Sequence, residues 1–136
     1  MESVPEGFEL VFTDAYAGLE ANGFRGDFVA IISSAAAHDH AVTYAAAADR
    51  IALPQALIEI PAGAENSDLF GDLRRSDHAP FWGAGSPAVF ITDTGEFRNL
   101  DYHCLTGPDE VADLDLDFAA VVTRATVEAS AIALGL

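Results

Sequence analysis

Residues 28–60 read FVAIISSAAAHDHAVTYAAAADRIALPQALIEI and contain the pattern that decides the fold. Five consecutive apolar residues, 28–32, follow a Gly-Asp turn signal and predict a buried strand. An alanine-rich stretch over 38–50 predicts a helix, and the short apolar run 56–60 predicts a second strand. A strand, a helix and a strand in this order are typical of an α/β unit.

The flanking sequence continues this alternation. Residues 13–22 begin with two capping residues and end before a glycine, which predicts a helix. A short helix is expected over 77–83 with Ser76 as its cap, a third strand over 87–92, and an amphipathic helix over about 115–134. Near-continuous apolar strands between helices predict an α/β fold with a mainly parallel sheet flanked by helices on both faces.

The composition combines a substantial apolar content with a very acidic charge. The chain has 136 residues, of which 51% are hydrophobic, and we expect one domain over 1–136. Six basic residues, all arginine, oppose 22 acidic ones, and the net charge is -16. We interpret this charge and the absence of lysine as halophilic adaptation, because molar salt screens the repulsion between carboxylates. An ordinary acidic protein from a GC-rich genome remains the alternative.

Several partners and compartments are disfavoured by the same composition. Duplex nucleic acid is not expected as a partner, because binding it requires basic residues that release counterions. Cys104 is the only cysteine, so the chain forms no internal disulfide and contains no paired-cysteine zinc motif. The first ten residues lack the features of a signal peptide, and no apolar run is long enough for a membrane helix. We therefore expect a soluble, cytoplasmic protein with no membrane partner.

Two long loops, 61–75 and 93–110, are predicted to bound the functional site. Each follows a predicted strand, and ligands of open α/β sheets bind beyond the carboxyl ends of the strands. Polar residues suited to chemistry are concentrated in or beside these loops, namely Asp77, His78, Asp93, Glu96, Arg98, Asp101, Tyr102 and His103.

An ordered set of motifs runs from Ser76 to His103. It comprises SDHAPF at 76–81, GAG at 83–85, PAVFITDT at 87–94, FRN at 97–99 and YH at 102–103. This order resembles the superfamily of zinc aminopeptidases with two adjacent metals, to which animal glutaminyl cyclases also belong. The likeness extends weakly over nearly the whole chain, and it implies the fold of the C-terminal half of a zinc-exopeptidase domain.

The resemblance also implies roles for individual residues. The histidine that His103 matches is a ligand of one zinc, and the tyrosine that Tyr102 matches hydrogen-bonds the substrate carbonyl oxygen as it becomes tetrahedral. Asp77 matches an aspartate near the metal centre. A neutral imidazole beside a phenol suits a site that binds metal and stabilises an oxyanion. Arg98 is a candidate to neutralise a carboxylate of the substrate or of a loop.

The chain departs from the family pattern in two respects. Cys104 replaces the threonine that usually follows the ligand histidine. The remaining ligand motifs of the family, a His-x-Asp-Ser and a Glu-Glu pair among them, are absent from the sequence. A hydrolytic zinc site needs three or more protein ligands and a base. We therefore expect zinc to be absent or weakly bound by this chain alone.

These observations leave three functional hypotheses. The first is an aminopeptidase-type metallohydrolase that releases N-terminal residues from peptides, present as a truncated or split chain that needs a complementary N-terminal half. The second is a catalytically inactive oligomerising or binding domain that hides its sheet edges in a homo-oligomer. The third, glutaminyl cyclisation, is disfavoured because that branch usually has tryptophan where Tyr102 stands.

Some polar and aromatic residues have simpler explanations. We expect His78 to fix a loop by hydrogen bonding, and Asp77 to cap a helix or support the metal centre. The spacing of His38-Asp39-His40 would suit metal binding, but two histidines near a helix start are more often exposed surface residues. Phe81 and Trp82 are expected in the core or in a pocket for an apolar side chain, and the Cys104 thiol is expected to be at least partly buried.

Overall fold

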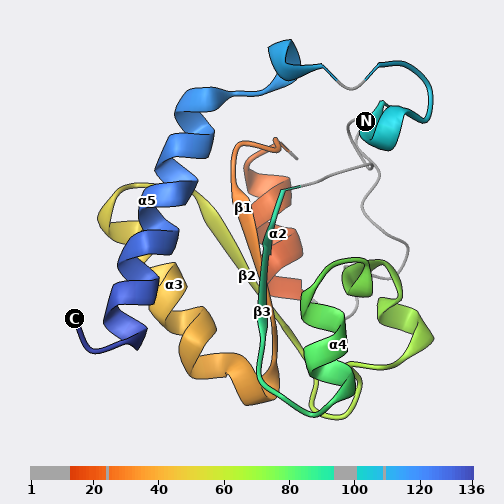
Figure 1. Cartoon of the computed structure of the whole chain (residues 1–136), viewed down its shortest axis with the longest axis vertical. Helices are drawn as coiled ribbons and strands as arrows, with labels where there is room; N and C mark the ends of the chain where they lie inside the picture. The colour runs from red at the N-terminus through yellow and green to blue at the C-terminus, as the bar shows by residue number, and fades with distance from the viewer. Residues whose placement is uncertain (1–12, 24, 94–100, 109) are drawn as a thin grey trace.

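The structure is a computed structural model that describes residues 13–23, 25–93, 101–108 and 110–136 (Figure 1). It is a small α/β fold in which each predicted helix and strand is present, with ends within two residues of those expected. The elements are α2 (Thr13–Ala21), β1 (Val29–Ser34), α3 (His38–Arg50), β2 (Gln55–Ile60), α4 (His78–Gly83), β3 (Val89–Thr92) and α5 (Leu116–Ala133).

The three strands form a mixed sheet in the order β2-β1-β3. β1 and β2 are parallel, with Val29 opposite Gln55, whereas β1 and β3 are antiparallel, with Ala30 opposite Thr92. The prediction of a mainly parallel sheet is therefore correct for only one of the two strand pairs.

The two connections between the strands contain helices of very different length. α3 has 13 residues and spans about 20 Å, which matches the length of a six-residue strand such as β1. It carries the chain back along the sheet, so that β2 starts at the same end as β1. α4 has six residues and spans only about 9 Å. The chain re-enters the sheet at the end where β2 finished, and β3 runs in the opposite direction.

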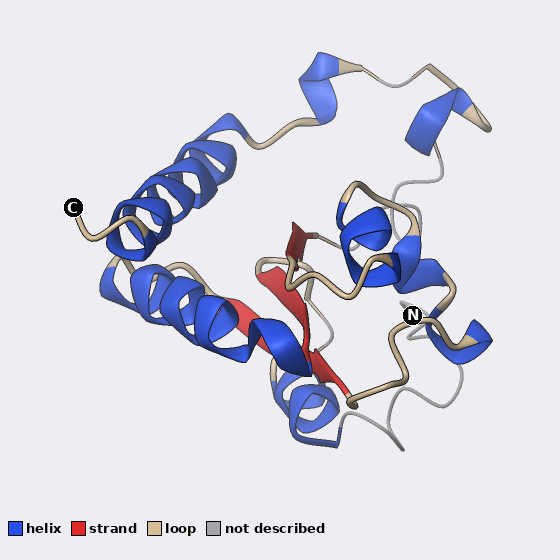
Figure 2. Cartoon of the chain, turned by 60° about the horizontal axis from the view of Figure 1, so that its bottom comes forward, coloured by secondary structure: helices blue, strands red, loops and turns tan. Residues whose placement is uncertain are grey.

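Both faces of the sheet are covered, because successive side chains of β1 point to opposite faces and are apolar on each. Val29 and Ile31 point into one apolar cluster, with residues of α3 and α5, and Ala30 and Ile32 point into a second. The second cluster is completed by Phe70, by Trp82 of α4 and by residues of β2. Figure 2 shows α3 and α5 side by side on one side of the sheet and α4 on the other.

α5 is anchored to α3 rather than to the strands. Buried alanines of both helices allow close approach, and the Arg50 guanidinium lies 2.6 Å from the carboxylate of Glu128. α5 begins at Asp115, whose side chain accepts a hydrogen bond of 2.8 Å from the Phe118 N–H. No helix in the described part of the chain is long and apolar enough to cross a membrane.

Candidate functional site

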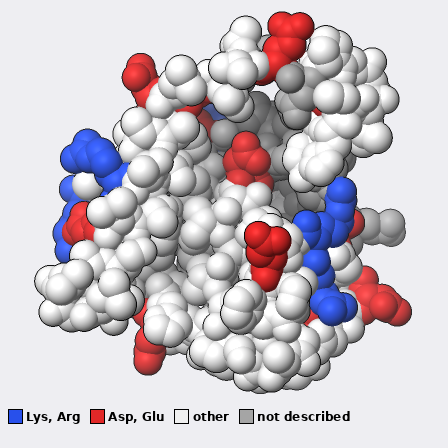
Figure 3. Space-filling model, viewed as in Figure 1, with Lys and Arg blue, Asp and Glu red and all other residues white. Residues whose placement is uncertain are grey.

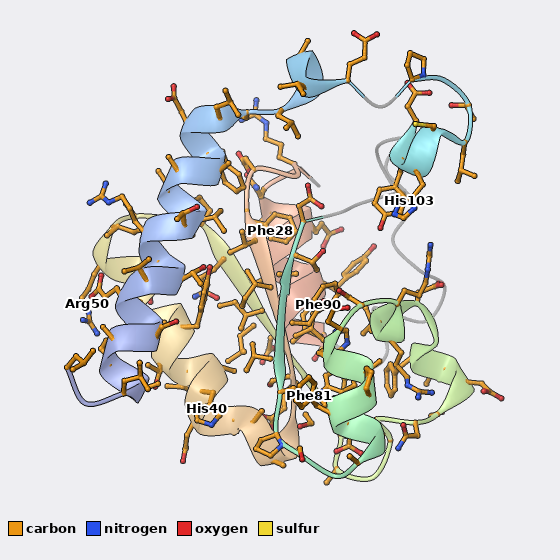
Figure 4. All side chains as sticks on the ribbon, viewed as in Figure 1. Phe28, His40, Arg50, Phe81, Phe90 and His103 are labelled. Carbon is orange, nitrogen blue, oxygen red and sulfur yellow. The ribbon has the colours of Figure 1, made fainter. Side chains whose placement is uncertain are left out.

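The segment beyond β3 presents the two residues that the resemblance singles out. Tyr102–Cys104 form one turn of 3₁₀ helix, in which the Tyr102 and His103 rings lie with centroids 4.2 Å apart. Tyr102 is half-buried and His103 is exposed, so the imidazole is accessible to a ligand. Figure 4 shows His103 on this segment, apart from α4 and from Phe90 of β3.

The backbone of this turn is strained. His103 has φ 57° and ψ 27°, and Cys104 has φ 59°, so two successive residues with a Cβ adopt the left-handed conformation. Each such residue costs on the order of 1–2 kcal/mol, which the surrounding contacts must offset.

Asp101 supplies those contacts. Its carbonyl oxygen accepts a hydrogen bond of 2.6 Å from the Cys104 N–H, and its carboxylate accepts one of 2.6 Å from the Thr106 hydroxyl. A Cβ on Gly107 would lie 2.6 Å from the same carboxylate, so a larger residue there would push the Asp101 side chain aside. Sequence reasoning missed Gly107 and Thr106 as supports of the turn. The Thr-Gly-Pro sequence at 106–108 is a turn signal that would have identified them.

His78 fixes the loop before α4, as predicted. Its Nε2 donates a hydrogen bond of 2.6 Å to the Leu73 carbonyl oxygen. The buried ring stacks on Phe90, with centroids 4.4 Å apart, and meets the edge of the Trp82 ring. Trp82 donates its indole N–H to the Ala88 carbonyl oxygen at 3.0 Å. His78 thus joins the 61–75 loop, α4 and β3, and its ring is not accessible to a metal.

The surroundings of His78 favour its neutral form. Burial lowers the pKa of His78 below its ordinary value, and the Arg74 guanidinium acts in the same direction. The hydrogen bond to Leu73 and the Asp77 carboxylate oppose this shift. Because the bonded carbonyl can only accept, Nε2 carries the proton of the neutral ring, and Nδ1 has no hydrogen-bond partner among the described residues.

Asp77 lies directly before α4, but its side chain does not cap the helix. Ser76, the predicted cap, accepts a hydrogen bond from the Ala79 N–H with its carbonyl oxygen, and no side-chain cap of α4 is seen among the described residues. The Asp77 carboxylate is exposed and, among the described residues, makes no hydrogen bond or ion pair with Tyr102 or His103.

The prediction that the two long loops bound one site at the carboxyl edge is wrong in its geometry. β3 is antiparallel to β1 and β2, so Thr92 ends β3 opposite Ala30, whereas β2 ends with Ile60 opposite Ser34. The segments after β2 and β3 therefore leave the sheet from opposite ends. Of the polar residues predicted for the second loop, Glu96 and Arg98 lie outside the described residues.

The remaining candidates divide between exposed and buried positions. Trp82 is buried in the core as expected, but Phe81 is 56% exposed. The prediction of a partly buried Cys104 thiol is wrong, because the strained turn directs this residue to the surface and leaves it exposed. His38 and His40 are exposed, as expected, and His38 Nδ1 lies 2.6 Å from a Glu59 carboxylate oxygen.

The described residues do not by themselves fit a zinc site. Nowhere among them do three His, Cys, Asp or Glu side chains gather in a way that could hold a metal ion. His103 offers one ligand nitrogen, and protein zinc sites need at least three donors. No family model, no curated protein and no solved structure matches the chain.

Proposed function

We propose that this chain is the C-terminal portion of an aminopeptidase-type metallohydrolase, which releases N-terminal residues from peptides. The observation that carries the proposal is the accessible His103 ring beside the Tyr102 ring, at the end of the ordered motifs of residues 76–103. In this proposal the fold is the C-terminal half of a zinc-exopeptidase domain.

The proposed chemistry assigns one task to each of the two adjacent rings. His103 binds a metal ion through one ring nitrogen. Zinc bound in such a site would activate a water molecule for attack. The Tyr102 hydroxyl donates a hydrogen bond to the substrate carbonyl oxygen as negative charge develops there. Two neighbouring residues in a turn held by Asp101 are well suited to act on one metal-bound peptide group.

Asp77 and Arg98 have supporting roles in the proposal. The exposed Asp77 carboxylate accepts hydrogen bonds from groups that orient the metal ligands, which is a common task of carboxylates around metal centres. Arg98 neutralises a carboxylate of the substrate or of a loop. Both residues act only once the metal centre is complete.

The remaining metal ligands come, in this proposal, from a complementary N-terminal half on another segment or polypeptide. A single histidine binds zinc weakly, and the described residues gather no group of three donors. We therefore infer that the isolated chain binds zinc weakly and hydrolyses peptides poorly. The single Cys104 and the acidic surface fit a reducing, salt-rich cytoplasm.

A second candidate function is a catalytically inactive oligomerising or binding domain derived from the same family. The specific observation in its favour is that, among the described residues, no further strand pairs with the outer edge of β2 or of β3. Such edges are available for pairing with another chain.

The first candidate is tested with the reading frame that lies immediately upstream of this one in the source genome. If that frame encodes His-x-Asp and Glu-Glu motifs, the two chains should be produced together and assayed in molar KCl for zinc content and hydrolysis of leucine p-nitroanilide. His103→Ala is expected to lose one zinc and nearly all activity. Tyr102→Phe is expected to keep both metals and lower kcat roughly 10- to 1000-fold with little change in KM.

His40→Ala provides the matched control, because His40 is an exposed histidine far along the chain from the motifs. It should change neither zinc content nor kcat. Activity that survives His103→Ala, or an upstream frame without any of these ligand motifs, would favour the inactive domain over the hydrolase.

A further inference from the structure

α4 is held against the rest of the fold by two buried side chains. Of its residues, His78 and Trp82 are buried, whereas the others are exposed or only partly buried. The two rings meet edge to face, with centroids 4.4 Å apart. Removal of either ring from the core would therefore weaken the attachment of the whole helix.

His78 is also the residue through which α4 meets its two neighbours. Its Nε2 bonds the Leu73 carbonyl oxygen in the loop 61–75, and its ring stacks on Phe90 of β3. The indole N–H of Trp82 donates to a backbone carbonyl oxygen just before β3. The loop, α4 and β3 thus meet at one group of three rings, those of His78, Trp82 and Phe90, which we call the His78 latch.

The latch accommodates a neutral imidazole but offers no acceptor for a second proton. Nδ1 of His78 is buried and has no hydrogen-bond partner among the described residues. The apolar cluster beside the latch consists of uncharged side chains from β1, β2, the loop 61–75 and β3, and α4 has no other titratable residue. A protonated ring would carry a buried, unpaired N–H, whereas in water the same group is fully hydrogen-bonded.

Burial has the largest effect on the pKa of His78 and lowers it, and two charged groups act in opposite directions. The Arg74 guanidinium also lowers this pKa, and the Asp77 carboxylate raises it. Asp72 and Arg75 of the same loop are exposed and lie 3.9 Å apart. Figure 3 shows positive side chains gathered on the side of the molecule where this loop lies. Charge and burial together keep the ring of the closed latch neutral.

We propose that the His78 latch is an acid-sensitive switch, in which protonation of His78 draws its ring into solvent and releases the loop 61–75 and α4 from β3. The half of the fold built on α3 and α5 stays in place, because its apolar cluster lies on the other face of the sheet and contains no residue of α4 or of the loop. Release uncovers the second apolar cluster, in which Phe70 and Trp82 are buried. The switch requires neither a metal site nor any activity.

The switch should be closed above about pH 6.5 and should open progressively below it. In the released state His78 is in water and has its ordinary pKa of 6.5, whereas in the closed latch its pKa is lower. The released state therefore takes up the proton first. The ratio of released to closed molecules rises by up to about 10-fold for each unit of pH below 6.5, until the closed latch is protonated as well.

Hydrogen exchange followed by NMR in molar KCl measures the release, with Trp82 as the internal reporter. Trp82 is the only tryptophan, so its indole N–H gives a single signal. Protection of this N–H and of the Gly85 and Ser86 amides, which bond the backbone of α4, should fall at least about 5-fold between about pH 7.5 and pH 5, after correction for intrinsic exchange rates. Buried amides of α3 should stay at least about 10-fold better protected at each pH.

Two substitutions beside the latch should change the size of this fall in opposite directions. Arg74→Gln raises the pKa of His78 in the closed latch toward its value in water, so the fall should become smaller. Asp77→Asn lowers that pKa further, so the fall should become larger. His78→Phe keeps an aromatic ring that does not titrate and should remove the pH dependence, whereas His40→Gln, at an exposed position, should keep it.

The proposal fails if protection of the Trp82 indole N–H does not change with pH. It also fails if α4 and α3 are equally protected at every pH, because the chain would then open as one unit. A fall that is as large in His78→Phe as in the unmodified chain would assign it to another group. If His78→Phe does not fold, the other two variants decide, and changes of the same sign in Arg74→Gln and Asp77→Asn overturn the proposal.

Discussion

His78 shows how one side chain ties three parts of the fold together. Its Nε2 bonds the Leu73 carbonyl oxygen, and its ring lies between Trp82 and Phe90. Nδ1 is buried without a hydrogen-bond partner among the described residues. A second proton on this ring would place an unpaired charge in an apolar cluster, which is costly in free energy.

This arrangement predicts a pH dependence of stability. The pKa of His78 is lowered from 6.5 in the folded chain, so the unfolded chain takes up the proton first as pH falls. The stabilisation is complete above about pH 6.5 and is lost as the pH falls below it, by up to about 1.4 kcal/mol per pH unit. Urea unfolding at fixed salt, at several values between about pH 7.5 and 5, measures this effect.

His78→Phe should flatten this part of the pH profile, because phenylalanine keeps the ring stacking and does not titrate. His40→Gln, which removes an exposed histidine, should leave the profile unchanged. A profile that is equally steep in His78→Phe and in the unmodified chain would assign the pH dependence to other groups.

Gly107 predicts a local effect on the turn that presents His103. A Cβ at this position would lie 2.6 Å from the Asp101 carboxylate, so Gly107→Ala should push that side chain aside and break its hydrogen bond with the Thr106 hydroxyl, which loosens the turn around the Cys104 N–H. We expect the Cys104 amide to exchange at least about 10-fold faster, with little change in global stability.

Gly83→Ala is the matched control, because a Cβ on Gly83 meets no atom within 4 Å. That variant should leave the Cys104 amide exchange rate unchanged. If Gly107→Ala also leaves it unchanged, then contact between Asp101 and Gly107 does not support the turn.

At the scale of the element, the sequence predicted the helices and strands well but not the direction of β3. The apolar pattern of residues 87–92 is the same for either direction of the strand. The direction depends instead on how the chain crosses from β2 to β3 through residues 61–88, a connection long enough for either direction. The strand pattern and the length of the connection therefore did not determine it.

The candidate site was predicted less completely than the fold, for a related reason. The loop-bracing role of His78 followed from its position beside a short helix and is confirmed by its bond to Leu73. The support of His103 by Asp101, Thr106 and Gly107 depends on the left-handed backbone of the turn. Residues other than glycine rarely adopt this conformation, so side-chain type alone did not reveal it.

The start of α5 gives a prediction at this scale. Asp115 accepts a hydrogen bond from the Phe118 N–H, so Asp115→Ala should destabilise the chain by about 1 kcal/mol in urea unfolding. Asp115→Asn keeps an acceptor at the same position and should cost much less. Equal losses in the two variants would show that charge near the helix start, rather than the cap, is responsible.

At the scale of the whole molecule, the acidic surface sets the conditions under which the fold is stable. A net charge of -16 on 136 residues produces strong repulsion within the folded chain. We expect the free energy of unfolding to rise by at least about 1 kcal/mol between millimolar and molar KCl, because salt screens this repulsion.

Thermal unfolding followed by circular dichroism measures this change, with sucrose as the control. Sucrose favours the compact state by exclusion from the surface but does not screen charge. If stability is the same in millimolar and molar KCl, the halophilic interpretation of the composition is wrong.

The central claim is that His103 is a metal ligand presented to a site that other donors complete. An NMR titration of the isolated chain with Zn²⁺ in molar KCl, observing the histidine ring protons, tests it most directly. The account predicts a weak, saturable shift of the His103 signals, absent in His103→Ala and preserved in His40→Ala. Unshifted His103 signals, or tight stoichiometric binding that persists in His103→Ala, would contradict it.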